Sequence, residues 1–96
     1  MIYEALGRER IEVANTAVGF TAASYNLSGK VVIYAQVQVV TAPIYVSPRG
    51  GTPSSSVGLS FNVGDIFEIW GKEDIEATRM LRQSATGAVE VTYYGK

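Results

Sequence analysis

The chain has 96 residues, with eight Lys and Arg against nine Asp and Glu, and it has no cysteine or histidine. This length allows one domain, residues 1–96, with a thin core, and the net charge of −1 gives no broad attraction to nucleic acid. The absent residue types exclude disulfides, a thiol nucleophile, the commonest general base and the commonest metal ligand. We therefore expect a protein that is not an enzyme, needs no cofactor and is stabilised by packing or oligomerisation.

The first ten residues are too charged for the apolar region of a signal peptide. Their charged members are Glu4, Arg8, Glu9 and Arg10. No apolar run in the chain approaches the roughly 20 residues of a membrane-spanning helix. We expect a protein that is made in the cytoplasm without membrane contact, and whose residues 1–10 can form an extended N-terminal arm.

Alternation of apolar and polar residues begins at residue 10. Ile11 and Val13 alternate with charged residues before a turn composition at Asn15–Thr16, which predicts a strand. A second short strand is expected over Val18–Thr21, and the small polar residues of Ser24–Lys30 predict a loop.

The stretch from Val31 to Gly64 contains a single charged residue, Arg49. Its residues 31–41 alternate between a wholly apolar face and a mixed face, as in a strand with one side on the core. The apolar face holds Val31, Ile33, Ala35, Val37 and Val39, and the mixed face holds Val32, Tyr34, Gln36, Gln38 and Val40. A domain this small cannot cover two uncharged strands on all sides, so we expect part of this surface and its backbone edge to meet another protein chain.

The last third of the chain predicts two strands on either side of a short helical turn. Asp65–Gly71 places Phe67 and Ile69 on one face, and Ala88–Tyr94 turns its valines and Tyr93 inward. Between them, Lys72–Met80 predicts a helical turn that crosses between sheets and leads into a strand over Met80–Gln83. Closely spaced strands with frequent turns predict an all-β fold, a single antiparallel β-sandwich or jelly-roll-like barrel with one short helical turn.

Few residues suggest catalysis or metal binding. The carboxylates of Asp65, Glu68, Glu73, Asp74 and Glu76 could serve glycoside hydrolysis or calcium binding. However, the spacing of a calcium loop is missing and Lys72 and Arg79 are near enough to pair with these acids, so we interpret them as a solvated charged turn. Ser54–Ser56 has no partner base, and Arg49-Gly50-Gly51 is interpreted as a hairpin turn. We predict no catalytic, cofactor or metal site.

The chain is rich in tyrosine, with six tyrosines and one tryptophan. These side chains bury a large area and keep a polar tip, so they suit core packing, protein interfaces and sugar-stacking platforms alike. Tyr34 and Trp70 fall on the less apolar faces of their strands, which favours a role for both in contacts with a partner or ligand.

A series of short motifs resembles a group of small structural proteins encoded by tailed bacteriophages and prophages. The resemblance covers roughly Asn15 to Gly95. The motifs, in order, are Ala42-Pro43-Ile44-Tyr45, Gly51-Thr52-Pro53, Val57-Gly58, Gly64-Asp65, Asp74-Ile75 with Arg79, and Val91-Thr92-Tyr93-Tyr94. The resemblance implies a virion component with a β-sandwich or jelly-roll-like fold, most simply a capsid decoration or cement protein that acts as a homo-oligomer, with a trimer favoured.

On this hypothesis the partner is the major capsid protein or another virion protein. A place at the neck, tail or fibre attachment point is the structural alternative, and a carbohydrate-binding module is the alternative from another class. The expected contacts include the loop Pro48–Ser56 and the following side chains: Val32, Tyr34, Gln36, Gln38, Tyr45, Arg49 and Trp70.

Overall fold

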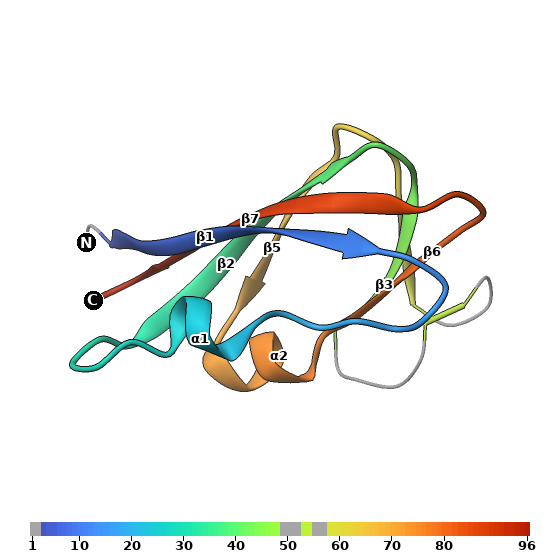
Figure 1. Cartoon of the computed structure of the whole chain (residues 1–96). Helices are drawn as coiled ribbons and strands as arrows, with labels where there is room; N and C mark the ends of the chain where they lie inside the picture. The colour runs from blue at the N-terminus through green and yellow to red at the C-terminus, as the bar shows by residue number, and fades with distance from the viewer. Residues whose placement is uncertain (1–2, 49–52, 55–57) are drawn as a thin grey trace.

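The protein folds into two antiparallel sheets packed face to face (Figure 1). The computed structural model describes residues 3–48, 53–54 and 58–96. These residues form seven strands and two short helices, neither of them long and apolar enough to cross a membrane. The prediction of an all-β, sandwich-like fold is confirmed, with a second short helix that the sequence did not indicate.

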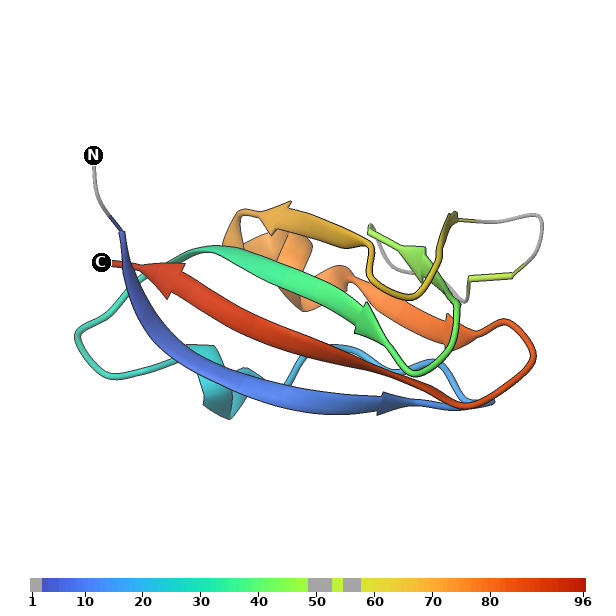
Figure 2. The same cartoon turned by 90° about the horizontal axis from the view of Figure 1, so that it is seen from above.

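The larger sheet has four strands in the order β1-β7-β2-β5, and each neighbouring pair is antiparallel. Seen from above, the four strands lie side by side (Figure 2). Their bounds are Glu4–Val13 for β1, Val32–Val40 for β2, Ile66–Trp70 for β5 and Gly87–Gly95 for β7. The central strands β2 and β7 therefore have neighbours on both sides, and β1 and β5 form the two edges.

The smaller sheet has three strands in the order β4-β3-β6. Their bounds are Ile44–Ser47 for β3, Leu59–Phe61 for β4 and Arg79–Arg82 for β6. The chain passes from one sheet to the other after β2, β4, β5 and β6, so the sheets share short corners. The passage from β5 to β6 is helix α2 (Lys72–Ala77), which confirms the predicted helical turn between the sheets.

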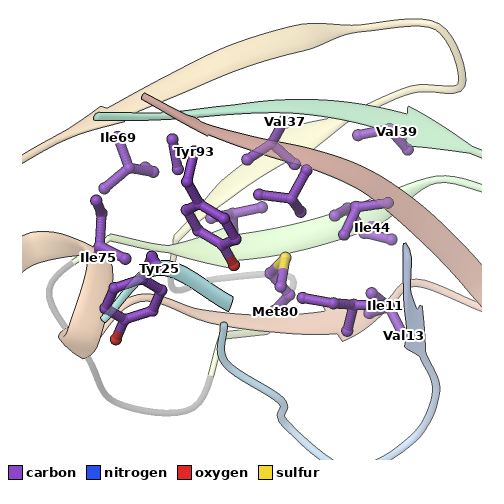
Figure 3. Close-up of a cluster of buried hydrophobic side chains, with 14 of the residues drawn as sticks. Ile11, Val13, Tyr25, Val37, Val39, Ile44, Ile69, Ile75, Met80 and Tyr93 are labelled. Carbon is purple, nitrogen blue, oxygen red and sulfur yellow. The ribbon is translucent and has the colours of Figure 1, made fainter. Parts of the chain in front are cut away.

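The core lies between the two sheets and consists of alternate residues from both (Figure 3). Val37 and Val39 of β2, together with Val89 and Val91 of β7, face Ile44 and Val46 of β3. Tyr93 is fully buried at the end of this layer, where Tyr25 and Phe20 pack against its ring at centroid distances of 5.1 and 6.1 Å. Burial of such aliphatic and aromatic surface is the main stabilising term for a domain of this size.

The N-terminal residues differ from the prediction. Residues 4–10 are extended but belong to the sheet, because β1 pairs with β7 from Glu4 beside Gly95 to Val13 beside Gly87, with one register shift between Ala5 and Gly7. The charges of Arg8 and Arg10 are compatible with a strand at this position because both residues lie on its solvent side. The sequence did not predict this part of the strand, because residues 4–10 are rich in charge and do not alternate between apolar and polar. Pairing with β7 makes the strand possible.

The connection between β1 and β2 also differs. The predicted strand Val18–Thr21 is wrong except for a single bridge between Val18 and Met80, and helix α1 (Ala22–Tyr25) begins before the predicted loop. One carboxylate holds this connection, since Glu9 Oε2 accepts the hydroxyl of Tyr93 at 2.5 Å and the amide of Thr21 at 3.2 Å. This carboxylate adds to backbone hydrogen bonds that join Val18 to Met80 and Ala14 to Arg82.

The face prediction fails at the start of β2. Val32 is buried in the core, at 4% exposure, whereas Val31 is exposed. The cause is a register shift between Val32 and Tyr34 in the pairing of β2 with β7, which interrupts the alternation. The prediction that Val32 lies on the outer, contact-making face is therefore wrong.

Candidate protein-binding surface

The outer face of the four-stranded sheet carries most of the residues expected to make contacts. Both helices lie on the other side of this sheet, behind it in the view of Figure 2 and below it in Figure 1. The outward side chains of β1, β7, β2 and β5 are therefore not covered by any helix of the described chain. Their alternation with buried residues places polar and aromatic groups together in rows across the strands.

The first of these rows, here called the aromatic row, consists of Tyr94, Tyr34 and Trp70. Strand pairing sets Tyr34 directly between the other two residues. Its ring stacks on Trp70 at a centroid distance of 4.3 Å and on Tyr94 at 4.8 Å. The rings are spaced like the strands that carry them, so they stand side by side and present their edges and polar tips outward.

Tyr3 packs against two members of the aromatic row. Its ring lies edge-on to Tyr34 at 6.1 Å and to Trp70 at 6.3 Å. The indole Nε1 of Trp70 donates to Glu68 Oε1 at 3.1 Å, which fixes the ring, yet Trp70 remains 51% exposed. Partial loss of water, with Tyr94 and Glu68 nearby, raises the pKa of Tyr34 above its usual value.

Two polar rows lie next to the aromatic row. The strand pairings align Arg8, Thr92, Gln36 and Glu68 in one row and Arg10, Glu90, Gln38 and Ile66 in the next. Arg10 pairs with Glu90 at 2.6 Å. A shallow hollow of about 130 Å³ lies between the rows, lined by Gln36, Gln38, Ile66, Glu90 and Thr92. The face therefore combines amides, paired charges and aromatic edges.

Strand β5 forms an edge of the sheet with hydrogen-bonding groups directed away from β2. The amide of Gly71 donates to Ile33 at 2.8 Å, and Asp65 accepts from the amide of Val39 at 2.9 Å. Because the pattern repeats every second residue, the amides and carbonyls of the even-numbered residues 66, 68 and 70 point away from β2. The side chains of Ile66 and Trp70 on this edge are 58% and 51% exposed.

The structure brings together four of the seven expected contact residues. Tyr34, Gln36 and Gln38 of β2 lie on this face beside Trp70 of β5. Val32 is in the core, and Tyr45 belongs to β3 in the other sheet. Arg49 and most of the expected contact loop, residues 49–52 and 55–56, lie outside the described residues.

The carboxylates weighed for metal binding or hydrolysis are dispersed in the described structure. Asp65 Oδ2 accepts the amide of Asn62 at 2.8 Å and so closes the turn before β5. Glu68 holds the indole of Trp70, whereas Glu73, Asp74 and Glu76 lie on α2. Among the residues described, no three Asp or Glu side chains are grouped so that they could hold a metal ion.

Several residues of this face were not singled out from the sequence. They are Tyr3, Arg8, Ile66, Thr92 and Tyr94. The alternation within each strand shows that Tyr94 and Ile66 face outward. That they share a surface with Tyr34 follows only from the strand order, which the sequence does not reveal.

The comparisons with known proteins find no match to this chain, whether with protein-family models, curated proteins or solved structures.

Proposed function

We propose that this protein is a non-enzymatic structural subunit that binds other protein chains through the outer face of its four-stranded sheet. The observation that carries the proposal is the aromatic row on an uncovered sheet face, with Trp70 half exposed. Tyrosine and tryptophan are enriched at the centres of protein interfaces, where they bury much area at a small entropic cost. The polar rows beside them fit the hydrogen-bonding rim of such an interface.

The stacking of the aromatic row favours a protein partner over a sugar. A sugar ring stacks on the open face of an aromatic ring, but Tyr34 has Trp70 on one side and Tyr94 on the other. What the row offers outward is ring edges and hydroxyl groups, which pack against and hydrogen-bond to protein groups.

We further propose that the assembly is the particle of a tailed bacteriophage, where the protein decorates and stabilises the capsid. The ordered motifs described above support this assignment by resemblance. Each copy would bridge subunits of the capsid lattice and so stabilise the shell by adding buried surface area. An interface of about 1,600 Å² is typical of stable specific contacts, and repetition over a shell multiplies a modest affinity.

Binding to undecorated phage heads tests this proposal. Purified protein is mixed with heads of a phage that encodes it, and occupancy is measured by cryo-electron microscopy for the wild type, Trp70→Ala and Leu59→Ala. Leu59 is a matched control, since it is an equally exposed apolar residue on β4 of the other sheet. We expect Trp70→Ala alone to lose occupancy. Absence of wild-type binding, or equal loss in both variants, would contradict the proposal.

Copy number separates the capsid from other places in the virion. Hundreds of copies per particle would indicate the head surface, whereas a few copies would indicate the neck, tail or a fibre attachment point. Quantitative mass spectrometry of purified particles gives this number.

Carbohydrate binding is the second candidate function. It rests on Trp70, which stands at the sheet edge with Tyr34 against one face of its ring and half of its surface exposed. A specific hit on a glycan array that disappears in Trp70→Ala and persists in Leu59→Ala would support it.

A further inference from the structure

We infer that copies of this chain associate edge to edge, so that β5 of one copy pairs with β1 of the next and the four-stranded sheet continues from copy to copy. The proposed function concerns a different protein bound on the sheet face. This inference goes beyond it, because it assigns a partner, a second copy, to the two sheet edges.

The strand directions allow this pairing, in which the register shift between Ala5 and Gly7 places one extra residue of β1 against β5. The sheet has the order β1-β7-β2-β5 with three antiparallel pairings, so β1 and β5 run in opposite directions. A second copy placed beside the first in the same orientation therefore brings its β1 antiparallel to β5. The outward amides and carbonyls at residues 66, 68 and 70 would then find strand partners, as exposed strand edges tend to do.

The side-chain rows continue across such a junction. If the rows of one copy continue into the rows of the next, Trp70 of the first copy lies beside Ala5 of the second. Glu68 then lies beside Arg8, and Ile66 lies beside Arg10. The small Ala5 leaves room for the indole. The aliphatic stem of Arg10 can cover Ile66, which is 58% exposed in the single chain.

The charges at the two edges are complementary. Arg8 is exposed and has no ion pair or side-chain hydrogen bond within the described part of the chain, and Glu68 bonds only the indole of Trp70 there. Opposite charges directly across a strand pair are stabilising, and like charges are destabilising. The in-register junction places these two side chains opposite each other.

The same rule disfavours a two-fold pairing of β5 with β5. The register that matches Ile66 with Trp70 places Glu68 against Glu68 of the other copy. Sliding by two residues sets Glu68 against Ile66 or against Trp70, depending on the direction, and leaves one end of each strand unpaired. The contact is therefore of the head-to-tail kind, which produces rings or open chains rather than two-fold dimers.

Engineered cysteines test the junction, because the natural chain has none. Three variants are prepared: Arg8→Cys, Glu68→Cys and the variant with both changes. Within one chain the two positions are three strand spacings apart, about 14 Å, which is too far for a disulfide. Oxidation with a mild disulfide such as oxidised glutathione therefore reports contacts between chains, read on non-reducing gels at several protein concentrations.

We expect the double variant to give a ladder of covalent oligomers. We also expect a mixture of the two single variants to give dimers that contain one chain of each. Covalent dimers of Glu68→Cys alone would establish the two-fold contact and overturn the inference. The absence of a ladder and of mixed dimers would also overturn it, provided that circular dichroism shows the variants folded.

Charge reversal gives an independent reading by light scattering over a hundredfold dilution. Arg8→Glu and Glu68→Arg should each dissociate the assembly, whereas an equimolar mixture of the two should reassemble, since every junction then pairs opposite charges. If Arg8→Glu leaves the mass unchanged, or if the wild type is a monomer throughout, the inference is wrong.

Discussion

Ile75 and Ile66 show how position, and not residue type, decides what an isoleucine contributes. Ile75 is the buried residue of α2 and belongs to the core, whereas Ile66 projects from the edge strand β5 with more than half of its surface exposed. Removing buried methyl groups loses their transfer free energy and leaves a cavity, but an exposed side chain loses little.

We therefore expect Ile75→Ala to lower the free energy of unfolding by about 2–5 kcal/mol. The matched change Ile66→Ala should alter it by no more than about 0.5 kcal/mol. Urea unfolding followed by circular dichroism, at a concentration where the protein is monomeric, measures both. Similar losses in the two variants would mean that α2 does not close the core as described.

Tyr93 and Glu9 form a polar contact at the core boundary. The hydroxyl of Tyr93 donates to Glu9 at 2.5 Å, and the ring is fully buried. Burial, then the hydrogen bond and charge of Glu9, raise the pKa of Tyr93 far above its usual value near 10. The folded protein therefore keeps this proton at a pH where the unfolded chain releases it.

This difference predicts a loss of stability in alkali. Below pH 10 Tyr93 is protonated in both the folded and the unfolded state, and its contribution to the free energy of unfolding is complete. Above pH 10 this tyrosine ionises only in the unfolded chain, so the free energy of unfolding falls as pH rises. Tyr93→Phe should cost about 1.5–3 kcal/mol at pH 7 through the lost hydrogen bond to a charged group and should flatten the decline above pH 10.

Urea unfolding from pH 7 to 11 tests this prediction. Tyr45→Phe, which removes one hydroxyl from the other sheet, is the control for the loss of a tyrosine hydroxyl at pH 7. An unchanged decline in Tyr93→Phe would show that another group is responsible.

At the scale of elements, the corners between the sheets depend on close backbone approach. Gly87 begins β7, where the chain arrives from the smaller sheet, and a Cβ placed there would lie 2.7 Å from the carbonyl oxygen of Ala42. That oxygen belongs to the corner between β2 and β3, so neither side can move without shifting a strand. The glycine lets two corners pack against each other.

Gly87→Ala should therefore lower the thermal unfolding midpoint more than Gly19→Ala. At Gly19 the nearest atom to a new Cβ is the guanidinium of Arg79, at 2.6 Å, with the carbonyl oxygen of Thr78 at 3.1 Å. The Arg79 side chain can move aside. Equal midpoints for the two variants would indicate that the corner relaxes and that close approach at Gly87 is not required.

At the scale of the whole molecule, stability should be unevenly distributed across the larger sheet. Strands β2 and β7 are paired on both sides, whereas β5 is short and paired on one side. Amide exchange reports the free energy of opening each hydrogen bond, which is highest in doubly paired, well-packed strands.

We expect the amides of β2 and β7 to exchange slowest and those of residues 66, 68 and 70 to exchange fast in dilute protein. Hydrogen exchange read by mass spectrometry or NMR checks this order. If copies pair through their edges, the β5 amides should slow as the protein concentration rises, while Leu59–Phe61 on β4 should not change. Slow exchange of β5 in the dilute monomer would contradict the assigned strand order.

The elements with local patterning could be predicted from the sequence. Alternation in residues 66–70 and 88–94 follows from side chains pointing to opposite faces, and both strands and their inward residues are confirmed. The short helix at Lys72–Ala77 and its passage between sheets were also predicted correctly. The placing of Tyr34, Gln36, Gln38 and Trp70 on outward faces follows from the same periodicity.

Features that depend on a distant strand partner are seen only in the folded structure. A register shift against β7 buries Val32, pairing with the same strand turns residues 4–10 into β1, and Glu9 anchors a connection that has no strand of its own. The order β1-β7-β2-β5 also gathers Tyr34, Tyr94 and Trp70 into one row. Pairings between residues far apart in the chain leave no periodic trace in either segment, so no local pattern could have revealed them.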